Sequence, residues 1–378
     1  MPWFTIKTRT GDCSAFSISH SPFIYSDKLK RMPAIAPGSK VLVTGANGFL
    51  ATHVVKAFLD RQYSVRGTVR SQEKGDHLHK LFSSHGNKFE TVVVKDITQE
   101  GAFDEVIKDV DAVAHTASPF HFEADDPNEL FIPAINGTKG ILQSARKSTT
   151  IKRIVILSST AAISNAPNPG KVYTEEDWND VAIKAVEEHG KAASGDEKYS
   201  ASKMRAEKAA WDWYNTNKAS VEWDLTTINP PFIFGPTLHE VDKLENLNTS
   251  SQLWYEQVVK NTSNSPDLGK SVGSYVDVRD VALANVLAVE KEAAGGERIL
   301  VPAAPFTWQD MINASRKVGP SIGLNNLPQG YTGYDASEVT YETVFSGEKL
   351  KGILGFKPIP LEDTVRDSLL DFKARGWL

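Results

Sequence analysis

Residues 40–55, Lys-Val-Leu-Val-Thr-Gly-Ala-Asn-Gly-Phe-Leu-Ala-Thr-His-Val-Val, constrain the fold of this chain more than any other stretch. A β-branched run ends at Gly45, Gly48 follows three residues later, and apolar residues then recur at helical spacing. This order predicts a strand, a tight glycine turn and a helix. Glycines let the backbone turn sharply and approach a ligand, and the N–H groups at the helix start can bind a pyrophosphate. Ala51 stands where such turns usually carry a third glycine.

Strand-like and helical stretches alternate after this turn. Strands are predicted at residues 63–70, 89–96, 110–119, 151–159 and 222–229, with a long helix at 128–148. Such alternation predicts an α/β fold, a Rossmann-type doubly wound parallel sheet with helices on both faces. Ligands of such sheets bind beyond the carboxyl ends of the strands.

We expect three parts in the chain. Residues 1–37 are Ser-rich and basic and show no strand–helix alternation. This extension is interpreted as a disordered tail, an organelle transit peptide, or sequence that precedes a translation start at Met32. Residues 38–236 form the predicted dinucleotide-binding domain. Residues 237–378 form a smaller, mostly helical substrate lobe, from which a strand and helix at 272–291 return to the Rossmann domain.

The substrate side is predicted only in outline. Residues 162–197 are polar and contain a short charged helix at 180–189, and residues 238–264 form a second polar loop with a helix near 252–260. A capping box at 307–310 starts a later helix, and two short helices end the chain. We expect the pocket near Phe120 and these two loops, and their mixture of aromatic and small residues suggests an apolar carbonyl compound.

Composition narrows the choice of partners. The 378 residues carry a net charge of −5, so nothing favours nucleic acid or an anionic membrane. Cys13 is the single cysteine, which excludes an intramolecular disulfide and a cysteine-based metal cluster. No apolar run reaches the length of a membrane span. We expect a cytoplasmic protein without a metal, a monomer or homodimer that takes a small-molecule substrate from solution.

The end of the second strand predicts the cofactor. NAD sites usually place a carboxylate there for the ribose 2′-hydroxyl, whereas an arginine suits a 2′-phosphate. Here the strand ends at Arg70, Lys74 follows one helical turn later, and no acid occupies the position. This pattern predicts NADPH, although the same residues also suit a solvated basic helix start.

Other strand ends should complete the cofactor site. Asp96 and Ile97 follow the third strand, where an adenine would lie, and the small residues Thr116, Ala117 and Ser118 let the fourth strand's turn pass beside the phosphates and nicotinamide ribose. The turn at 230–236 includes Pro230, Phe232 and Ile233, and we expect it to border the nicotinamide end of the cofactor site. His115 lies in an apolar strand, so we interpret it as a hydrogen-bonded core histidine rather than a catalytic base.

Hydroxyl groups and a lysine gather around the same edge. Ser158, Ser159 and Thr160 follow the fifth strand, where serines alone would indicate only a turn or a helix cap. Tyr199 and Lys203 are four residues apart in a strongly helical stretch and therefore share a face. Tyr-x-x-x-Lys occurs often by chance, but chance explains poorly its position downstream of a glycine turn and strand-end serines.

Taken together, these motifs resemble the extended short-chain dehydrogenase/reductases. Residues 65–74, Val-Arg-Gly-Thr-Val-Arg-Ser-Gln-Glu-Lys, look like the dihydroflavonol-reductase-like branch, and in particular its microbial NADPH-dependent aldehyde, methylglyoxal and ketone reductases. The resemblance covers residues 38–376. It implies catalytic roles for Ser159, Tyr199 and Lys203 and cofactor contacts at these residues: Gly45, Asn47, Gly48, Phe49, Leu50, Arg70, Lys74, Asp96 and Ile97. No match to the plant signature of cinnamoyl-CoA reductases is present, which argues against a CoA thioester substrate.

The chemistry that the resemblance implies is carbonyl reduction. Hydride transfer to a carbonyl carbon builds negative charge on the oxygen, to which Tyr199 would donate a proton while Ser159 hydrogen-bonds it. Free tyrosine has a pKa of about 10, and the ammonium of Lys203 is expected to lower that pKa. Lys203 would also hydrogen-bond the nicotinamide ribose.

Three alternatives remain open. A nucleotide-sugar epimerase or dehydratase shares the fold and the Tyr-x-x-x-Lys motif, but usually prefers NAD. A 3β-hydroxysteroid-type dehydrogenase would act in the oxidative direction. An NADPH-sensing regulator would bind the dinucleotide without chemistry, but such proteins typically lose the tyrosine or the lysine.

Overall fold

The computed structural model describes residues 35–118, 124–164 and 167–378. Residues 1–34, which make up most of the predicted extension, and Phe120, a predicted pocket residue, lie outside the described residues. The described part belongs to one compact unit. The predicted boundary between residues 236 and 237 stays a prediction.

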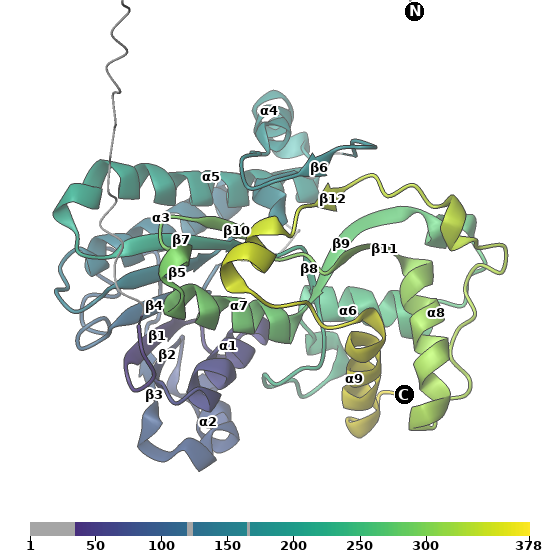
Figure 1. Ribbon diagram of the computed structural model, residues 1–378, viewed down its shortest axis with the longest axis horizontal. Coiled ribbons are helices and arrows are strands. Elements are labelled where there is room, and N and C mark those ends of the chain that lie inside the picture. The colour runs from purple at the N-terminus through teal and green to yellow at the C-terminus, as the bar shows by residue number, and fades with distance from the viewer. Residues whose placement is uncertain (1–34, 119–123, 165–166) are drawn as a thin grey trace, which may run out of the picture. The chain divides into compact units, whose positions relative to one another are not determined.

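A seven-stranded parallel sheet forms the centre of the described chain, in the order β10-β7-β5-β4-β1-β2-β3 (Figure 1). The predicted doubly wound sheet is thereby confirmed. The strands are β1 (Lys40–Thr44), β2 (Ser64–Val69), β3 (Phe89–Val93), β4 (Ala112–His115), β5 (Arg153–Leu157), β7 (Asp224–Asn229) and β10 (Arg298–Leu300). Strand β3 ends three residues before its predicted end.

Helices cover both faces of this sheet (Figure 1). Helices α1 (Phe49–Asp60) and α7 (Val278–Glu290) pack with Val41 and Val43 of β1 on one face. Helices α3 (Asn128–Ala145) and α5 (Gly195–Asn217) pack with Leu42 on the other face. This division follows from the strand geometry, because successive side chains of a strand point to opposite faces.

The strand predicted at the start of residues 272–291 does not return to the central sheet, so this expectation is corrected. Strand β9 (Ser271–Asp277) lies in a separate three-stranded sheet, ordered β11-β9-β8, with β8 (Phe232–Phe234) and β11 (Ala304–Thr307). The place beside β7 in the central sheet is occupied by β10, which pairs with residues 227–229. Residues predicted as a turn thus contain β8, whereas α7 does pack against the central core as expected.

The remaining long helices pack on one or other of these sheets. Helix α2 (Gln72–Leu81) contacts β2 and β3, and α4 (Asp180–His189) contacts α5. Helices α6 (Thr249–Tyr255), α8 (Trp308–Val318) and α9 (Leu361–Ala374) pack with the small sheet, and β6 (Val172–Tyr173) pairs with β12 (Val344–Phe345). The predicted helix at 180–189 and the capping box of α8 are confirmed. The described helices include none long and apolar enough to span a bilayer.

Candidate active site

The glycine turn lies between β1 and α1, as the sequence predicts. Gly45 has a φ of +67°, and a Cβ there would lie 3.2 Å from the Cβ of Ala117. A side chain at this position would therefore meet both backbone strain and the β4 turn. No described side chain caps α1, and its first turn contains no acidic residue. Its N–H groups thus form a site that suits an anion.

Two threonines that sequence reasoning missed hold this turn in place. The Gly45 N–H donates to Thr68 Oγ1 at 2.9 Å. Thr44 Oγ1 accepts from the N–H groups of Thr116 and Ala117 at 3.1 and 3.0 Å, which ties the glycine turn to the end of β4. Both are polar residues at or near the ends of buried strands, a signal that could have indicated them.

The end of β2 carries the predicted 2′-phosphate residues, and both are exposed. Arg70 follows β2 directly, and its charge helps to lower the pKa of Asp96, after the larger effect of two hydrogen bonds from Thr98. Lys74 lies in the first turn of α2, with its Nζ 3.4 Å from a carboxylate oxygen of Glu240. Ile97 packs beneath α3, where its Cδ1 would lie 3.0 Å from a Cβ at Gly137.

Ser159 lies just beyond the carboxyl end of β5. Its Oγ accepts from the Ala161 N–H at 3.1 Å, and the next residue, Thr160, donates its N–H to the Pro230 carbonyl at 3.0 Å. The hydroxyl therefore stands between the ends of β5 and β7. Phe232 and Ile233 follow in β8, where Phe232 is partly exposed and Ile233 pairs with β9.

Helix α5 brings Tyr199 and Lys203 to the same edge. Lys203 Nζ lies 5.5 Å from the centroid of the Tyr199 ring, which confirms that the two residues share a face. Lys203 donates to Ser118 Oγ at 2.8 Å, so β4 and α5 meet here. The strand-end residues and the helical pair thus come together as predicted.

The expected pKa of Tyr199 needs a correction. Burial raises the pKa of its hydroxyl above the ordinary value, while the side-chain hydrogen bond with Ser159 acts in the opposite direction. The hydrogen bond with Ser159 therefore favours the phenolate, but burial outweighs it. Lys203 is buried as well, which lowers its own pKa to about 8, and its expected effect on the pKa of Tyr199 stays a prediction.

His115 is a core residue. It is 3% exposed, and its Nδ1 lies 3.0 Å from Thr44 Oγ1. Burial lowers its pKa to about 4, and Lys203 contributes in the same direction. The interpretation as a hydrogen-bonded core histidine is therefore confirmed.

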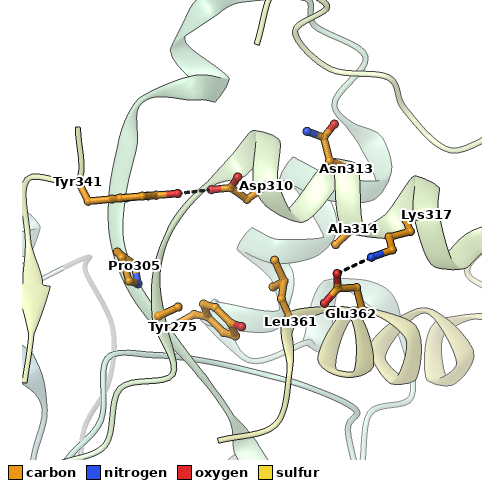
Figure 2. A pocket seen from close by; sticks show the side chains of 10 residues that line it. Tyr275, Pro305, Asp310, Asn313, Ala314, Lys317, Tyr341, Leu361 and Glu362 are labelled. Carbon is orange, nitrogen blue, oxygen red and sulfur yellow. Dashed lines mark hydrogen bonds and ion pairs between the residues drawn. The ribbon is translucent and has the colours of Figure 1, made fainter. Parts of the chain in front are cut away.

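A cavity of about 360 Å³ opens away from these residues, in the C-terminal part of the chain. Figure 2 shows it between Tyr275, Tyr341, Asp310 and the ion pair of Lys317 with Glu362. Asp310 already accepts hydrogen bonds from Tyr334 and Tyr341. The lining includes none of the predicted catalytic or cofactor residues, so this cavity is not the candidate active site.

The residues around the glycine turn fit a dinucleotide. The turn brings backbone N–H groups and a Cβ-free surface next to the β4 turn, and exposed cations follow β2. Such a cradle suits a pyrophosphate, and Arg70 with Lys74 suits a further phosphate on the ribose.

The fold and this edge define a class of protein. Residues 41–301 match the NAD dependent epimerase/dehydratase family, and the chain belongs to this family of extended short-chain dehydrogenase/reductases. The resemblance inferred from the motifs is confirmed.

Individual relatives narrow the class. The chain is 37% identical over 348 residues to the NADPH-dependent methylglyoxal reductase GRE2 of Saccharomyces cerevisiae. The alignment covers 89% of this chain and 99% of that protein. The ketoreductase azaE of Aspergillus niger is 38% identical over 316 residues, covering 79% and 90%. The crystal structure of yeast methylglyoxal/isovaleraldehyde reductase Gre2 complexed with NADPH matches with a TM-score of 0.80 at 36% identity, covering 90% of this chain and 100% of that one.

Proposed function

We propose that this protein is an NADPH-dependent carbonyl reductase that acts on small or medium-sized apolar aldehydes or ketones, with Tyr199 as the proton donor. The observation that carries the proposal is the hydrogen bond between Ser159 and Tyr199 beside Lys203, at the edge where the glycine turn also lies. The yeast and fungal relatives, which are reductases, support the same class of reaction.

The cofactor would be held along the carboxyl edge of the sheet. The backbone of residues 45–50 would bind the pyrophosphate, and Arg70 and Lys74 the 2′-phosphate. Asp96 and Ile97 would border the adenine, and these residues the nicotinamide half: Thr116, Ala117, Ser118, Pro230, Phe232 and Ile233. When bound, NADPH supplies the hydride that reduces the carbonyl carbon.

Side chains of the protein would supply the proton that the carbonyl oxygen takes up. As the carbonyl becomes an alcohol, its oxygen takes the proton of the Tyr199 hydroxyl, and Ser159 holds that oxygen by a hydrogen bond. Burial raises the pKa of Tyr199, so the hydroxyl stays protonated and ready to donate at neutral pH. Lys203 would orient the nicotinamide ribose, in exchange for its present bond to Ser118.

The experiment is NADPH oxidation followed at 340 nm with methylglyoxal, an aromatic aldehyde, a β-ketoester and a dihydroflavonol. We expect consumption with at least one of them, and the ranking identifies the substrate class. If no compound of the panel causes NADPH oxidation while NADPH still binds tightly, the proposed reductase activity is contradicted. An epimerase or an NADPH sensor would then be favoured.

The matched variant is Tyr199→Phe, which removes one oxygen atom. We expect NADPH affinity within a few-fold of wild type and a loss of turnover of about 10²- to 10⁴-fold, the usual contribution of a positioned proton donor. Retained turnover in this variant would contradict the role of Tyr199 without touching the cofactor site.

The proposal extends to the protein's state in the cell. We infer a cytoplasmic monomer or homodimer, and the single cysteine, Cys13, is typical of a protein in a reducing compartment. Cell fractionation and size-exclusion chromatography with light scattering test these two points separately.

A further inference from the structure

Glu207 is a buried carboxylate that lies beneath the candidate active site. Its side chain is fully buried, and it stands on α5 four residues after Lys203. Each carboxylate oxygen accepts two hydrogen bonds. Oε1 accepts from Arg298 Nε at 2.6 Å and Thr227 Oγ1 at 3.1 Å, and Oε2 from Ser158 Oγ at 2.6 Å and Asn229 Nδ2 at 2.7 Å.

Two of these donors lead directly to Ser159. Ser158 is the preceding residue, so fixing its side chain fixes the end of β5. Asn229 donates from the same Nδ2 to the Ser159 carbonyl at 3.2 Å. Glu207 therefore holds the backbone on both sides of the Ser158–Ser159 peptide, although it has no bond to the Ser159 hydroxyl itself.

Arg298 fixes the carboxylate from the other side. The guanidinium lies 3.7 Å from the centroid of the Trp178 ring, and its Nη1 donates to the carbonyls of Glu175 and Asp177. The pair of Arg298 with Glu207 thus joins β10, α5 and residues 175–178, part of the loop expected to border the substrate. A carboxylate with an arginine, whose side chain is 10% exposed, and three neutral donors is well compensated for its loss of water.

We propose that Glu207 is a positioning residue for carbonyl reduction, which holds Ser158 and Asn229 so that Ser159 presents its hydroxyl to Tyr199. This inference rests on the proposed function and deepens it. It assigns no contact between Glu207 and the substrate or cofactor.

The informative variant is Glu207→Gln. It keeps the size of the side chain, but one carboxylate oxygen becomes an amide nitrogen that faces an N–H donor and a hydroxyl. The hydrogen bond from the N–H donor is lost, and the one with the hydroxyl persists only if the hydroxyl turns to accept. Misplacement of a catalytic group by about 1 Å costs up to about 100-fold in rate. We expect kcat to fall about 10- to 100-fold, with the Kd for NADPH within about threefold of wild type.

The chain offers a matched control between the same two strands. Asp224 at the start of β7 accepts from Arg153 at the start of β5, with distances of 2.5 and 2.8 Å to Nε and Nη2. This pair is also buried, but it lies at the opposite end of β5 and β7 from Ser159. Asp224→Asn should lower the melting temperature as Glu207→Gln does. Its kcat should stay within about threefold of wild type, because coupling between distant sites is small.

A second readout does not depend on turnover. The ¹³Cζ resonance of Tyr199, assigned by its absence in Tyr199→Phe, reports the environment of the phenol oxygen. We expect Glu207→Gln to shift this resonance in the same direction as Ser159→Ala does, and Asp224→Asn to leave it in place. If Glu207→Gln fails to fold, Ser158→Ala and Asn229→Ala each remove one donor and should show smaller changes of the same sign.

The outcomes separate the two proposals. A wild-type protein that reduces no carbonyl compound overturns the proposed function, and the Tyr199 resonance still decides whether Glu207 positions Ser159. A different result overturns the positioning role alone. In that case the wild-type protein reduces a carbonyl compound, and the folded Glu207→Gln variant has the same kcat and the same Tyr199 resonance as Asp224→Asn.

Discussion

Arg70, together with Lys74, is the residue from which preference for NADPH over NADH is expected to arise. It is exposed directly after β2, so its guanidinium can reach a 2′-phosphate. Arg70→Asp replaces an attraction by a repulsion, and we expect the Kd for NADPH to rise at least about tenfold, while that for NADH changes little. Isothermal titration with both cofactors measures this ratio.

The control for this prediction is another exposed arginine. Arg146 follows α3 as its C-cap and is likewise exposed, so Arg146→Asp makes the same change of charge outside the predicted cofactor residues. An unchanged ratio of the two affinities in Arg70→Asp, as in Arg146→Asp, would place the 2′-phosphate site elsewhere.

The site residues differ in how far the sequence could predict them. The glycine turn, the strand-end serine and the pair of Tyr199 and Lys203 depend on local spacing, and their positions follow once each strand and helix is known. Glu207 was missed because its role depends on Asn229 and Arg298, which come from other strands. A buried acid one helical turn after Lys203 carries no local signal of that kind.

Helix α5 is the element that carries both Tyr199 and Lys203, and its start is set by a capping box. Glu197 N donates to Ser194 Oγ at 3.2 Å, and Ser194 N to the Glu197 carboxylate at 2.7 Å. Ser194→Ala removes one of these bonds, and we expect the free energy of unfolding to fall by about 1 kcal/mol. Urea unfolding measures it.

The exposed Ser83, outside any described long helix, provides the comparison for this element. Ser83→Ala should change the free energy of unfolding by less than about 0.5 kcal/mol, as surface substitutions usually do. Equal losses in the two variants would show that the cap adds no stability to α5.

At this scale, strands were harder to assign to a sheet than to find. The apolar run at 272–277 predicts a strand, but period and composition do not say which neighbour it pairs with. The choice depended on β10, a three-residue strand that occupies the edge beside β7. Residues 232–234 were hidden among prolines and glycines, which ordinarily indicate a turn.

At the scale of the whole molecule, one buried acid contributes to the pH dependence of stability. Asp280, on α7, is 3% exposed, and its carboxylate accepts from the Ile359 N–H at 2.8 Å. Burial raises its pKa to about 7, and Asp277 adds to this effect, while the Ile359 hydrogen bond and Arg279 oppose it. The folded state therefore keeps a proton that the unfolded state, with an ordinary aspartate, loses near pH 4.

The sign of the effect follows from this difference in bound protons. Between about pH 4 and pH 7 the folded state binds more protons than the unfolded state at Asp280, so this residue's contribution to stability falls as the pH rises and levels off above pH 7. Asp280→Asn removes the titration, and the amide oxygen can still accept from Ile359. We expect the free energy of unfolding of the variant, relative to that of wild type, to increase by about 1–3 kcal/mol as the pH rises from 5 to 8.

Melting temperatures of both proteins from pH 5 to pH 8 measure this gain. Other groups whose pKa is shifted by burial, such as His53 and His239, titrate in both proteins and cancel in the difference. Asp212→Asn, at an exposed position on α5, controls for the removal of one negative charge from the surface and should give a curve parallel to that of wild type. A curve for Asp280→Asn that is also parallel would mean that Asp280 is ionised in the folded protein throughout this range, with Arg279 and the Ile359 N–H compensating fully for its burial.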